Sequence, residues 1–168
     1  MTRASHSAPC GQLRFVAAGP DDPVAQPLFT ELAVEYAQRY GGGPQRYMDW
    51  MRDGPAEEFA PPDGGMLIGL LDSRPVTGGA FCRFDAHTAE LKRIWTHRAH
   101  RRRGYAAALV GELETQIAAR GYRKVYLITG DRQPEAEELY LSLGYTRLPE
   151  PLPSRGPVLP VAFEKSLA

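Results

Sequence analysis

A basic stretch, Arg101-Arg102-Arg103-Gly104-Tyr105-Ala106, lies between an apolar strand-like segment and an amphipathic helical one. The first backbone N–H groups of a helix have no partners within it and lie at the positive end of its dipole, so they can bind phosphate. Gly104 lets the backbone approach such a ligand closely. The stretch therefore predicts an anion site at a helix start, although by itself a solvated basic helix start explains it about equally well.

Strand and helix patterns alternate on the C-terminal side of this stretch. Apolar residues recur there at helical spacing, and proline and glycine mark the helix ends. The expected elements are a helix over 104–120, a strand over 124–128, a helix from Pro134 to Gly144 and a strand over 161–165. Between the last two, residues 149–160 read as a stiff proline-rich loop.

The N-terminal side contributes helices and then a meander of strands. The expected elements are a strand over 12–18, helices over 23–40 and 45–52, a loop over 53–65, and strands over 66–71, 75–83 and 88–96. Asp72-Ser73-Arg74 should form the short turn of an antiparallel hairpin. Taken together, the order of elements predicts an α/β fold with a mixed sheet.

Length and composition favour one globular domain. The chain has 168 residues, of which 43% are hydrophobic and 24% charged, and its 20 basic residues balance 20 acidic ones. We expect residues 1–11 to be a flexible tail and 12–168 to be the domain. No apolar run approaches the ~20 residues of a membrane span, and residues 1–12 lack a signal-peptide core, which favours a cytoplasmic protein. The two cysteines, Cys10 and Cys82, are too few for a disulfide framework or a metal site.

Two motifs together resemble a known family. Arg101-x-x-Gly104-x-Ala106 resembles the pyrophosphate-binding signature of the GNAT N-acetyltransferases, and residues 136–145, with Leu139-Tyr140 and Gly144-Tyr145, resemble a pattern on a later helix of that family. The resemblance covers about residues 88–147. It implies a single-domain GNAT-like fold with a mixed sheet of six to seven strands, splayed between the fourth and fifth strands and flanked by about four helices.

The resemblance also implies that acetyl-CoA is the cosubstrate and that no metal is needed. The strand at Ile94 would offer its backbone to the pantetheine arm, and the basic turn would hold the pyrophosphate. The implied cofactor-binding residues are Ile94, Trp95, Thr96, Arg101, Arg102, Arg103, Gly104, Tyr105, Ala106 and Gln133. Gln133 departs from the family, which often has Asn before the last helix, but its amide could form the same hydrogen bonds.

Glu90 is the candidate general base. A primary alkylamine has a pKa of roughly 10.4, so it must lose a proton before it attacks a thioester. Glu90 lies on the strand leading into the basic turn, and histone-type family members similarly place a Glu there. A surface carboxylate paired with Lys92 or Arg93 is the alternative. Whether the base acts directly or through a water molecule is left open by the sequence.

Tyr140 is the candidate general acid. A phenol held near the sulfur can give the leaving thiolate a proton, and similar family members use the Tyr of the Leu-Tyr pair in this way. The alternative is an aromatic side chain that packs beside Leu139 and Leu143.

The expected function is direct transfer of an acetyl group from acetyl-CoA to a primary amine of a small molecule or peptide. Two alternatives are a non-catalytic acyl-CoA-binding regulatory domain and a nucleic-acid-binding module that uses the basic loop 97–103. The zero net charge weakens the latter, and we expect no nucleic-acid or membrane partner, whereas a homodimer is compatible with the sequence. Acidic residues on the early helices could attract a cationic amine, but a solvated helix face explains them equally well; they are Glu31, Glu35, Asp49 and Asp53.

Overall fold

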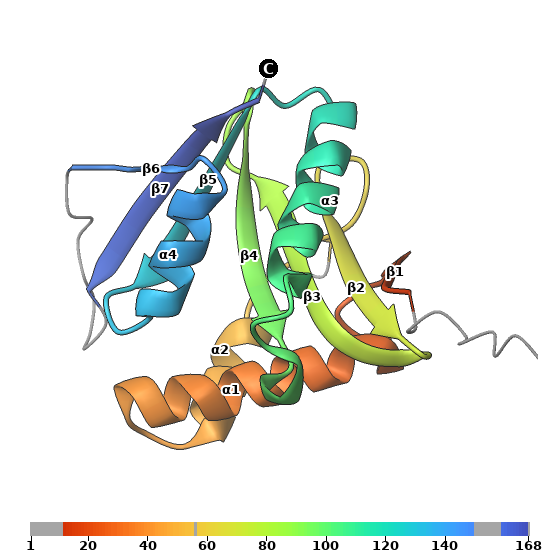
Figure 1. Ribbon diagram of the computed structural model, residues 1–168, viewed down its shortest axis with the longest axis vertical. Coiled ribbons are helices and arrows are strands. Elements are labelled where there is room, and N and C mark those ends of the chain that lie inside the picture. Colours follow the sequence, from red (N-terminus) through yellow and green to blue (C-terminus); the bar gives the residue numbers. More distant parts are fainter. Residues whose placement is uncertain (1–11, 56, 150–158, 168) are drawn as a thin grey trace, which may run out of the picture.

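A computed structural model describes residues 12–55, 57–149 and 159–167, which form one mixed seven-stranded sheet with helices on both faces. The sheet order is β1-β2-β3-β4-β5-β7-β6 (Figure 1). The strands are β1 (Arg14–Ala17), β2 (Gly65–Leu71), β3 (Arg74–Arg83), β4 (Thr88–Thr96), β5 (Lys124–Gly130), β6 (Thr146–Arg147) and β7 (Pro160–Ser166). The predicted α/β fold is confirmed. The proposed tail, 1–11, and most of the proline-rich loop lie outside the described residues.

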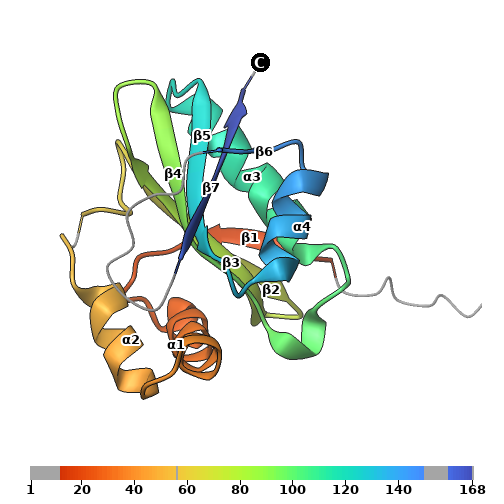
Figure 2. The same ribbon diagram turned by 90° about the vertical axis from the view of Figure 1, so that its left-hand side faces the viewer.

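Four α-helices and two short 3-10 turns complete the fold. They are η1 (Pro23–Ala25), α1 (Gln26–Tyr40), α2 (Pro44–Arg52), η2 (Arg98–His100), α3 (Tyr105–Ala119) and α4 (Pro134–Ser142). Figure 2 shows α1 and α2 on one side of the sheet and α3 and α4 on the other. No helix within the described ranges is long and apolar enough to cross a membrane.

The alternating side chains of the strands build a core on each face. In β2, Leu67 joins the core beneath α3 and α4, whereas Met66 and Ile68 join the core beneath α1 and α2. Helix α3 buries Leu109 and Leu113 on its face of the sheet. Burial of this kind contributes about 25 cal/mol per Å² of apolar surface, so both helical layers are fixed to the sheet.

The predicted short turn joins β2 and β3 but is one residue shorter than expected, because Arg74 already belongs to β3. Asp72 and Ser73 both have positive φ, 49° and 65°, as a two-residue turn of the type that suits twisted hairpins requires. Strands β2 and β3 then pair antiparallel from Leu71 and Arg74 back to Gly65 and Phe81.

Strands β4 and β5 run parallel and then part. Four residue pairs join them, from Thr88 opposite Lys124 to Leu91 opposite Leu127, although both strands continue beyond these positions. In Figure 1 the two strands meet at one end and diverge toward α1. The splay expected between the fourth and fifth strands is therefore present.

A β-bulge interrupts β4 just beyond this point. The register against β3 shifts between Gly78 and Ala80, and Arg93 has a φ of 60°. An extra residue in one strand turns neighbouring side chains to the same face. Lys92 and Arg93 consequently both project toward the α2 side, where Lys92 pairs with Glu58.

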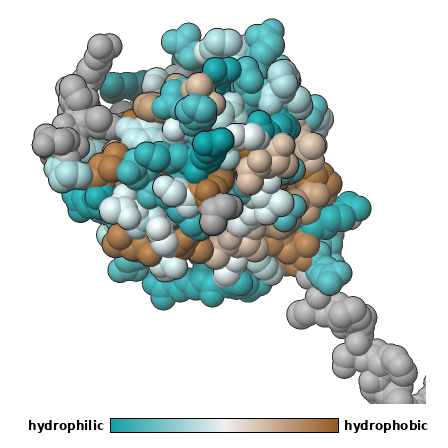
Figure 3. All heavy atoms as spheres, turned by 90° about the horizontal axis from the view of Figure 1, so that it is seen from above, coloured by the Kyte–Doolittle hydropathy of each residue, from teal (hydrophilic) through white to brown (hydrophobic). Residues whose placement is uncertain are grey.

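The outer surface is mixed in character. On the face seen in Figure 3, hydrophobic residues are interspersed among hydrophilic ones. Trp50 on α2 is a large hydrophobic side chain that stays 58% exposed, and it borders the main cavity of the molecule. Trp50 is therefore part of the cavity wall rather than of the core.

Candidate active site

A cavity of about 1120 Å³ opens where β4 and β5 part. Its walls come from α1 and α2, from the ends of β4 and β5, from the turn that begins α3, and from α4. Ordinary small-molecule pockets occupy about 300–1,000 Å³. The cavity is thus large enough to admit a cofactor arm and a small second substrate from different directions.

The basic turn supplies unpaired backbone donors to this cavity. Arg102 and Gly104 have φ values of 63° and 80°, so the chain reverses sharply before α3. The first helical hydrogen bond runs from the Ala108 N–H to the Gly104 carbonyl oxygen. The N–H groups of the preceding residues, Tyr105 and Ala106 among them, are the donors that a helix start leaves free for an anion. A Cβ atom added at Gly104 would meet nothing within 4 Å, so the space beside it is open.

Most residues that the sequence assigned to cofactor binding line the cavity. They are Ile94, Trp95, Thr96, Arg101, Arg102, Gly104, Tyr105, Ala106 and Gln133. Arg103 does not line it. The end of β4, the turn that begins α3 and the start of α4 thus converge on this cavity.

The side chains near the strand end are held away from the cavity centre by α1. The Trp95 indole Nε1 donates to Glu31 Oε2 over 2.6 Å, and His97 Nε2 lies 3.2 Å from the other oxygen of that carboxylate. Trp95 is 2% exposed. The gap between the diverging strands β4 and β5 is called the wedge below. Any contact of Trp95 with a ligand in this wedge therefore uses the Trp95 backbone.

Pairing between β4 and β5 ends inside the cavity. Beyond Leu91 and Leu127 the two strands share no residue pair, and residues 128–130 of β5 pair with β7 on their other edge. Unpaired backbone groups in the middle of a sheet are costly unless a ligand or water satisfies them. The wedge is therefore suited to a ligand that carries amide groups.

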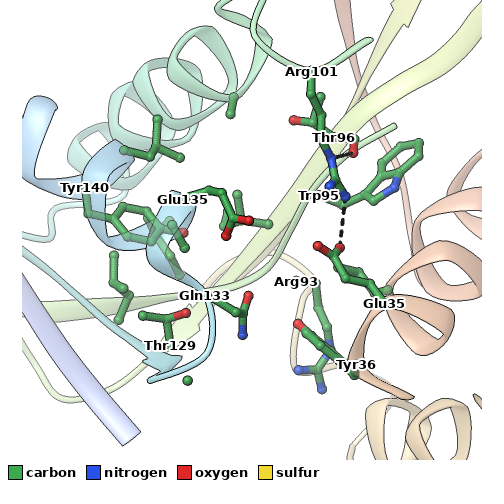
Figure 4. Close-up of a pocket in the computed structure, with 18 of the residues that line it drawn as sticks. Glu35, Tyr36, Arg93, Trp95, Thr96, Arg101, Thr129, Gln133, Glu135 and Tyr140 are labelled. Atoms are coloured by element: carbon green, nitrogen blue, oxygen red, sulfur yellow. Dashed lines mark hydrogen bonds and ion pairs between the residues drawn. The ribbon is translucent and has the colours of Figure 1, made fainter. Parts of the chain in front are cut away.

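Tyr140 reaches the cavity from α4 (Figure 4). Its ring packs against Tyr145 and Phe163, with centroids 5.5 Å and 5.9 Å away, and the residue is 5% exposed. Burial raises the pKa of the Tyr140 phenol well above its ordinary range, so the hydroxyl stays protonated. The side chain therefore combines packing with a potential donor.

Glu90 lies on β4 outside the set of cavity-lining residues. It is opposite Cys82 on β3 and Tyr126 on β5, and it is half-buried. Burial raises the pKa of its carboxyl. Within the described part of the chain Glu90 forms no ion pair, because Lys92 is bonded to Glu58. The alternative role for Glu90, a surface carboxylate paired with Lys92 or Arg93, is therefore not the arrangement in the structure.

Gln133 stands at the start of α4, where its side-chain amide donates to the Tyr40 hydroxyl over 3.2 Å. It is also half-buried at the cavity wall. The residue that departs from the family pattern therefore keeps an amide in the cavity, tethered to α1.

Sequence reasoning considered the early helices as a source of acceptor contacts but did not single out three residues of the wall on the α1 and α2 side. Tyr36, Trp50 and Arg93 line the cavity there. A usable signal was present in the pair Lys92-Arg93, because two adjacent cations inside a strand cannot both face solvent unless the strand is irregular.

Comparison with known proteins agrees with this geometry. A family model described as the Acetyltransferase (GNAT) family matches residues 26–145. The chain belongs to the GNAT acetyltransferase family. A comparison with curated protein sequences finds no match.

Many solved structures share this GNAT fold. One from Klebsiella pneumoniae, assigned as an acyl-CoA N-acyltransferase, has a TM-score of 0.72 at 21% identity and covers 94% of this chain and 99% of its own. The yncA protein from Salmonella typhimurium, with its cofactor acetyl-CoA, gives 0.69 at 15% identity, covering 93% and 94%. A GNAT family acetyltransferase from Elizabethkingia anophelis with acetyl-CoA bound gives 0.62 at 14% identity, covering 92% and 98%. At these identities the likeness extends to the fold alone.

Proposed function

We propose that this GNAT protein transfers an acetyl group from acetyl-CoA directly to the primary amine of a small molecule or peptide. The observation that carries the proposal is the parting of β4 and β5 at Leu91 and Leu127, beside the free N–H groups that begin α3. A wedge with unpaired strand edges suits an arm that contains amides, and a helix start suits a pyrophosphate. Both features meet in one cavity.

The residues that would hold acetyl-CoA follow from this placement. The backbone of Ile94 to Thr96 would face the arm, and the N–H groups from Gly104 to Ala106 would donate to the pyrophosphate, with Arg102 adding charge at the exposed turn. Acetyl-CoA supplies a thioester: the amine nitrogen bonds to its carbonyl carbon, the carbon–sulfur bond breaks, and the sulfur takes a proton. The chain must therefore remove one proton from the amine and deliver one to the sulfur.

Glu90 is the proposed base, acting through water. The residue lies on the same strand as the cavity-lining Lys92 but does not line the cavity, so a water molecule would carry the proton across the gap. Its raised pKa moves the carboxylate closer to the pKa of an amine and improves it as a base.

Tyr140 is the proposed acid. Its burial keeps the hydroxyl protonated, which is the form that can donate to a developing thiolate. No hydrogen bond of that hydroxyl to another group occurs among the described residues, so it is available to a ligand.

The test is a thiol-release assay with acetyl-CoA against amino acids, polyamines, aminoglycosides and peptides, combined with calorimetry of CoA binding. We expect CoA to bind and at least one amine to release thiol. Absence of CoA binding would contradict the proposal outright. Tight CoA binding with no turnover on any amine would instead support the regulatory-domain alternative.

A further inference from the structure

Arg93 is a half-buried cation at the cavity wall with a buried donor left unused. Its guanidinium carbon lies 4.9 Å from the centroid of the Trp50 ring and 5.9 Å from that of Phe59, and Nη2 donates to the Met51 carbonyl oxygen over 3.3 Å. Its Nε is buried and has no hydrogen-bond partner among the residues that the structure describes. A buried donor without an acceptor is costly in free energy, and such groups in native proteins usually have a functional reason.

The charge of Arg93 also lacks a close counter-ion. Glu58 is bonded to Lys92 at 3.1 Å, and Glu35 is shared by Arg39 and Arg101. Glu90 forms no ion pair with Arg93, although the two charges influence each other. In the described ranges, no carboxylate lies within ion-pair distance of Arg93. Burial lowers the pKa of its guanidinium, and this effect outweighs the opposing influence of Glu58 and Glu90.

Tyr36 adds a second donor beside this cation. The Tyr36 ring centroid lies 6.3 Å from that of Trp50, which the Arg93 guanidinium also contacts. Figure 4 shows Tyr36 and Arg93 across the cavity from Tyr140. Burial raises the pKa of the Tyr36 phenol to about 12, so its hydroxyl remains a donor at neutral pH. The Tyr47 ring centroid lies 5.9 Å from that of Tyr36, so Tyr47 extends the aromatic wall.

We propose that Arg93 and Tyr36 bind a carboxylate of the acceptor, so that the amine substrates are amino acids or other amino carboxylates. This inference rests on the proposed acetyl transfer. A planar guanidinium fork and a neutral hydroxyl match the two oxygens of a carboxylate, and one uncompensated positive charge matches one negative charge. The exposed ring of Trp50 would contact the remainder of the acceptor.

The position of Arg93 supports this assignment. It lies on β4 next to Ile94, the first residue of the segment proposed to face the acyl arm, and the bulge directs its side chain toward α1 and α2. A carboxylate held there would leave the amine of the same molecule free to point toward the wedge. The acceptor would thus enter from the side opposite the basic turn.

A matched set of acceptors tests the inference: L-amino acids, their amides and the corresponding decarboxylated amines. We expect kcat/KM for the acids to exceed that for the amides and amines by at least about tenfold. Equal or better use of the amides and amines would overturn the carboxylate site while leaving acetyl transfer intact. Calorimetric titration of the same acids and amides into the CoA-saturated protein gives the answer without turnover, and equal affinity for both series would also overturn the site.

Three variants separate the carboxylate contact from structural damage. Arg93→Met should lower kcat/KM for the acids by about ten- to a hundredfold and that for the amides far less. Arg93→Lys should recover part of the preference, and Tyr36→Phe should lower it severalfold. Arg46→Gln, which removes an exposed cation from the same cavity wall, is the matched control and should leave the preference unchanged. Equal losses for acids and amides in Arg93→Met would mean that Arg93 only supports the fold.

Discussion

The guanidinium of Arg101 donates to the carboxylate of Glu35 over 3.1 Å, which joins the turn before α3 to helix α1 across the mouth of the cavity. Glu35 also accepts from Arg39 over 2.8 Å, and Arg39 reaches Glu135 on α4 at 3.0 Å. This chain of four charges, of which Figure 4 draws the pair Arg101 and Glu35, connects three elements around the proposed cofactor site. It fixes the position of Arg101 but also neutralises part of the charge that a pyrophosphate would meet.

Glu35→Gln should therefore tighten CoA binding while loosening α1 slightly. Because the pairs are partly exposed, the free energy of unfolding should fall by no more than about 1 kcal/mol. The Kd for CoA should decrease by roughly two- to fivefold at low salt and return toward the wild-type value at high salt, since screening weakens exposed charges. Calorimetry at two salt concentrations measures both effects.

A matched control is Glu112→Gln, which removes an exposed glutamate from α3 without touching this network. It should leave the Kd for CoA unchanged. Weaker CoA binding by Glu35→Gln would mean that positioning of Arg101 matters more than its free charge.

Gly104→Glu should nearly abolish CoA binding in a protein that still folds. The substitution adds a carboxylate beside the N–H groups proposed to bind the pyrophosphate, at a position whose φ of 80° also disfavours side chains. Gly104→Ala, which strains the backbone without adding charge, should cost about 1 kcal/mol of stability and a smaller part of the affinity.

The comparison variant is Gly111→Glu, which lies within α3 where an added Cβ also meets nothing within 4 Å. Its CoA affinity should match that of the unchanged protein. If Gly104→Glu binds CoA normally by calorimetry, the pyrophosphate site is elsewhere.

Glu90→Gln should reduce the rate of acetyl transfer by about 10² to 10⁴ at neutral pH, with partial recovery as the pH rises and the amine loses its proton unaided. The Kd for CoA should stay the same. A rate within twofold of the unchanged enzyme would remove Glu90 from the mechanism.

The Glu90→Gln substitution should lower the rate of acetyl transfer but leave the melting temperature unchanged or raise it. Because burial raises the folded-state pKa of Glu90, the stabilising protonated form is fully present below the unfolded pKa and is lost as the pH rises through the folded value. At neutral pH the ionised carboxylate thus opposes folding, and the glutamine variant should melt at the same or a higher temperature. The melting-temperature difference between the two proteins should shrink in acid.

Tyr140→Phe should lower turnover by about 10² or more while changing the free energy of unfolding by less than about 1 kcal/mol. The ring contacts with Tyr145 and Phe163 survive the change. The contrasting control is Tyr122→Phe, whose lost hydroxyl donates to the Asp63 carbonyl oxygen over 2.7 Å. That variant should lose stability with its kinetics intact. Normal turnover in Tyr140→Phe would assign thiolate protonation to water or another donor.

Local patterns were sufficient to predict the cofactor half of the molecule. The strand expected over 88–96 is β4, and the helix expected over 104–120 is α3 within one residue at each end, because glycines mark the limits of α3 in the sequence itself. The helix expected from Pro23 instead begins as a 3-10 turn and becomes α1 at Gln26, and the two-residue β6 was not predicted.

The acceptor half could not be predicted because its geometry depends on contacts between distant strands. A strict two-residue alternation would turn Arg93 away from Lys92, whereas the bulge brings both to one face. The reason lies partly on β3, where an added Cβ at Gly79 would come within 2.6 Å of Ile94 Cδ1. That glycine makes room for the displaced strand. The adjacent cations Lys92 and Arg93 indicate an irregular strand, but the direction in which Arg93 turns depends on this contact with β3.

The parting of β4 and β5 also affects how the acceptor specificity of such a protein can evolve. The proposed donor contacts begin at Ile94 and lie mostly in later parts of the chain, whereas the proposed acceptor contacts belong to α1, α2 and Arg93. Substitutions on α1 and α2 at positions other than Glu35, which bonds to Arg101, can therefore recruit a new amine without altering the turn that begins α3. One inherited donor site can in this way serve a lineage of enzymes that differ in what they modify.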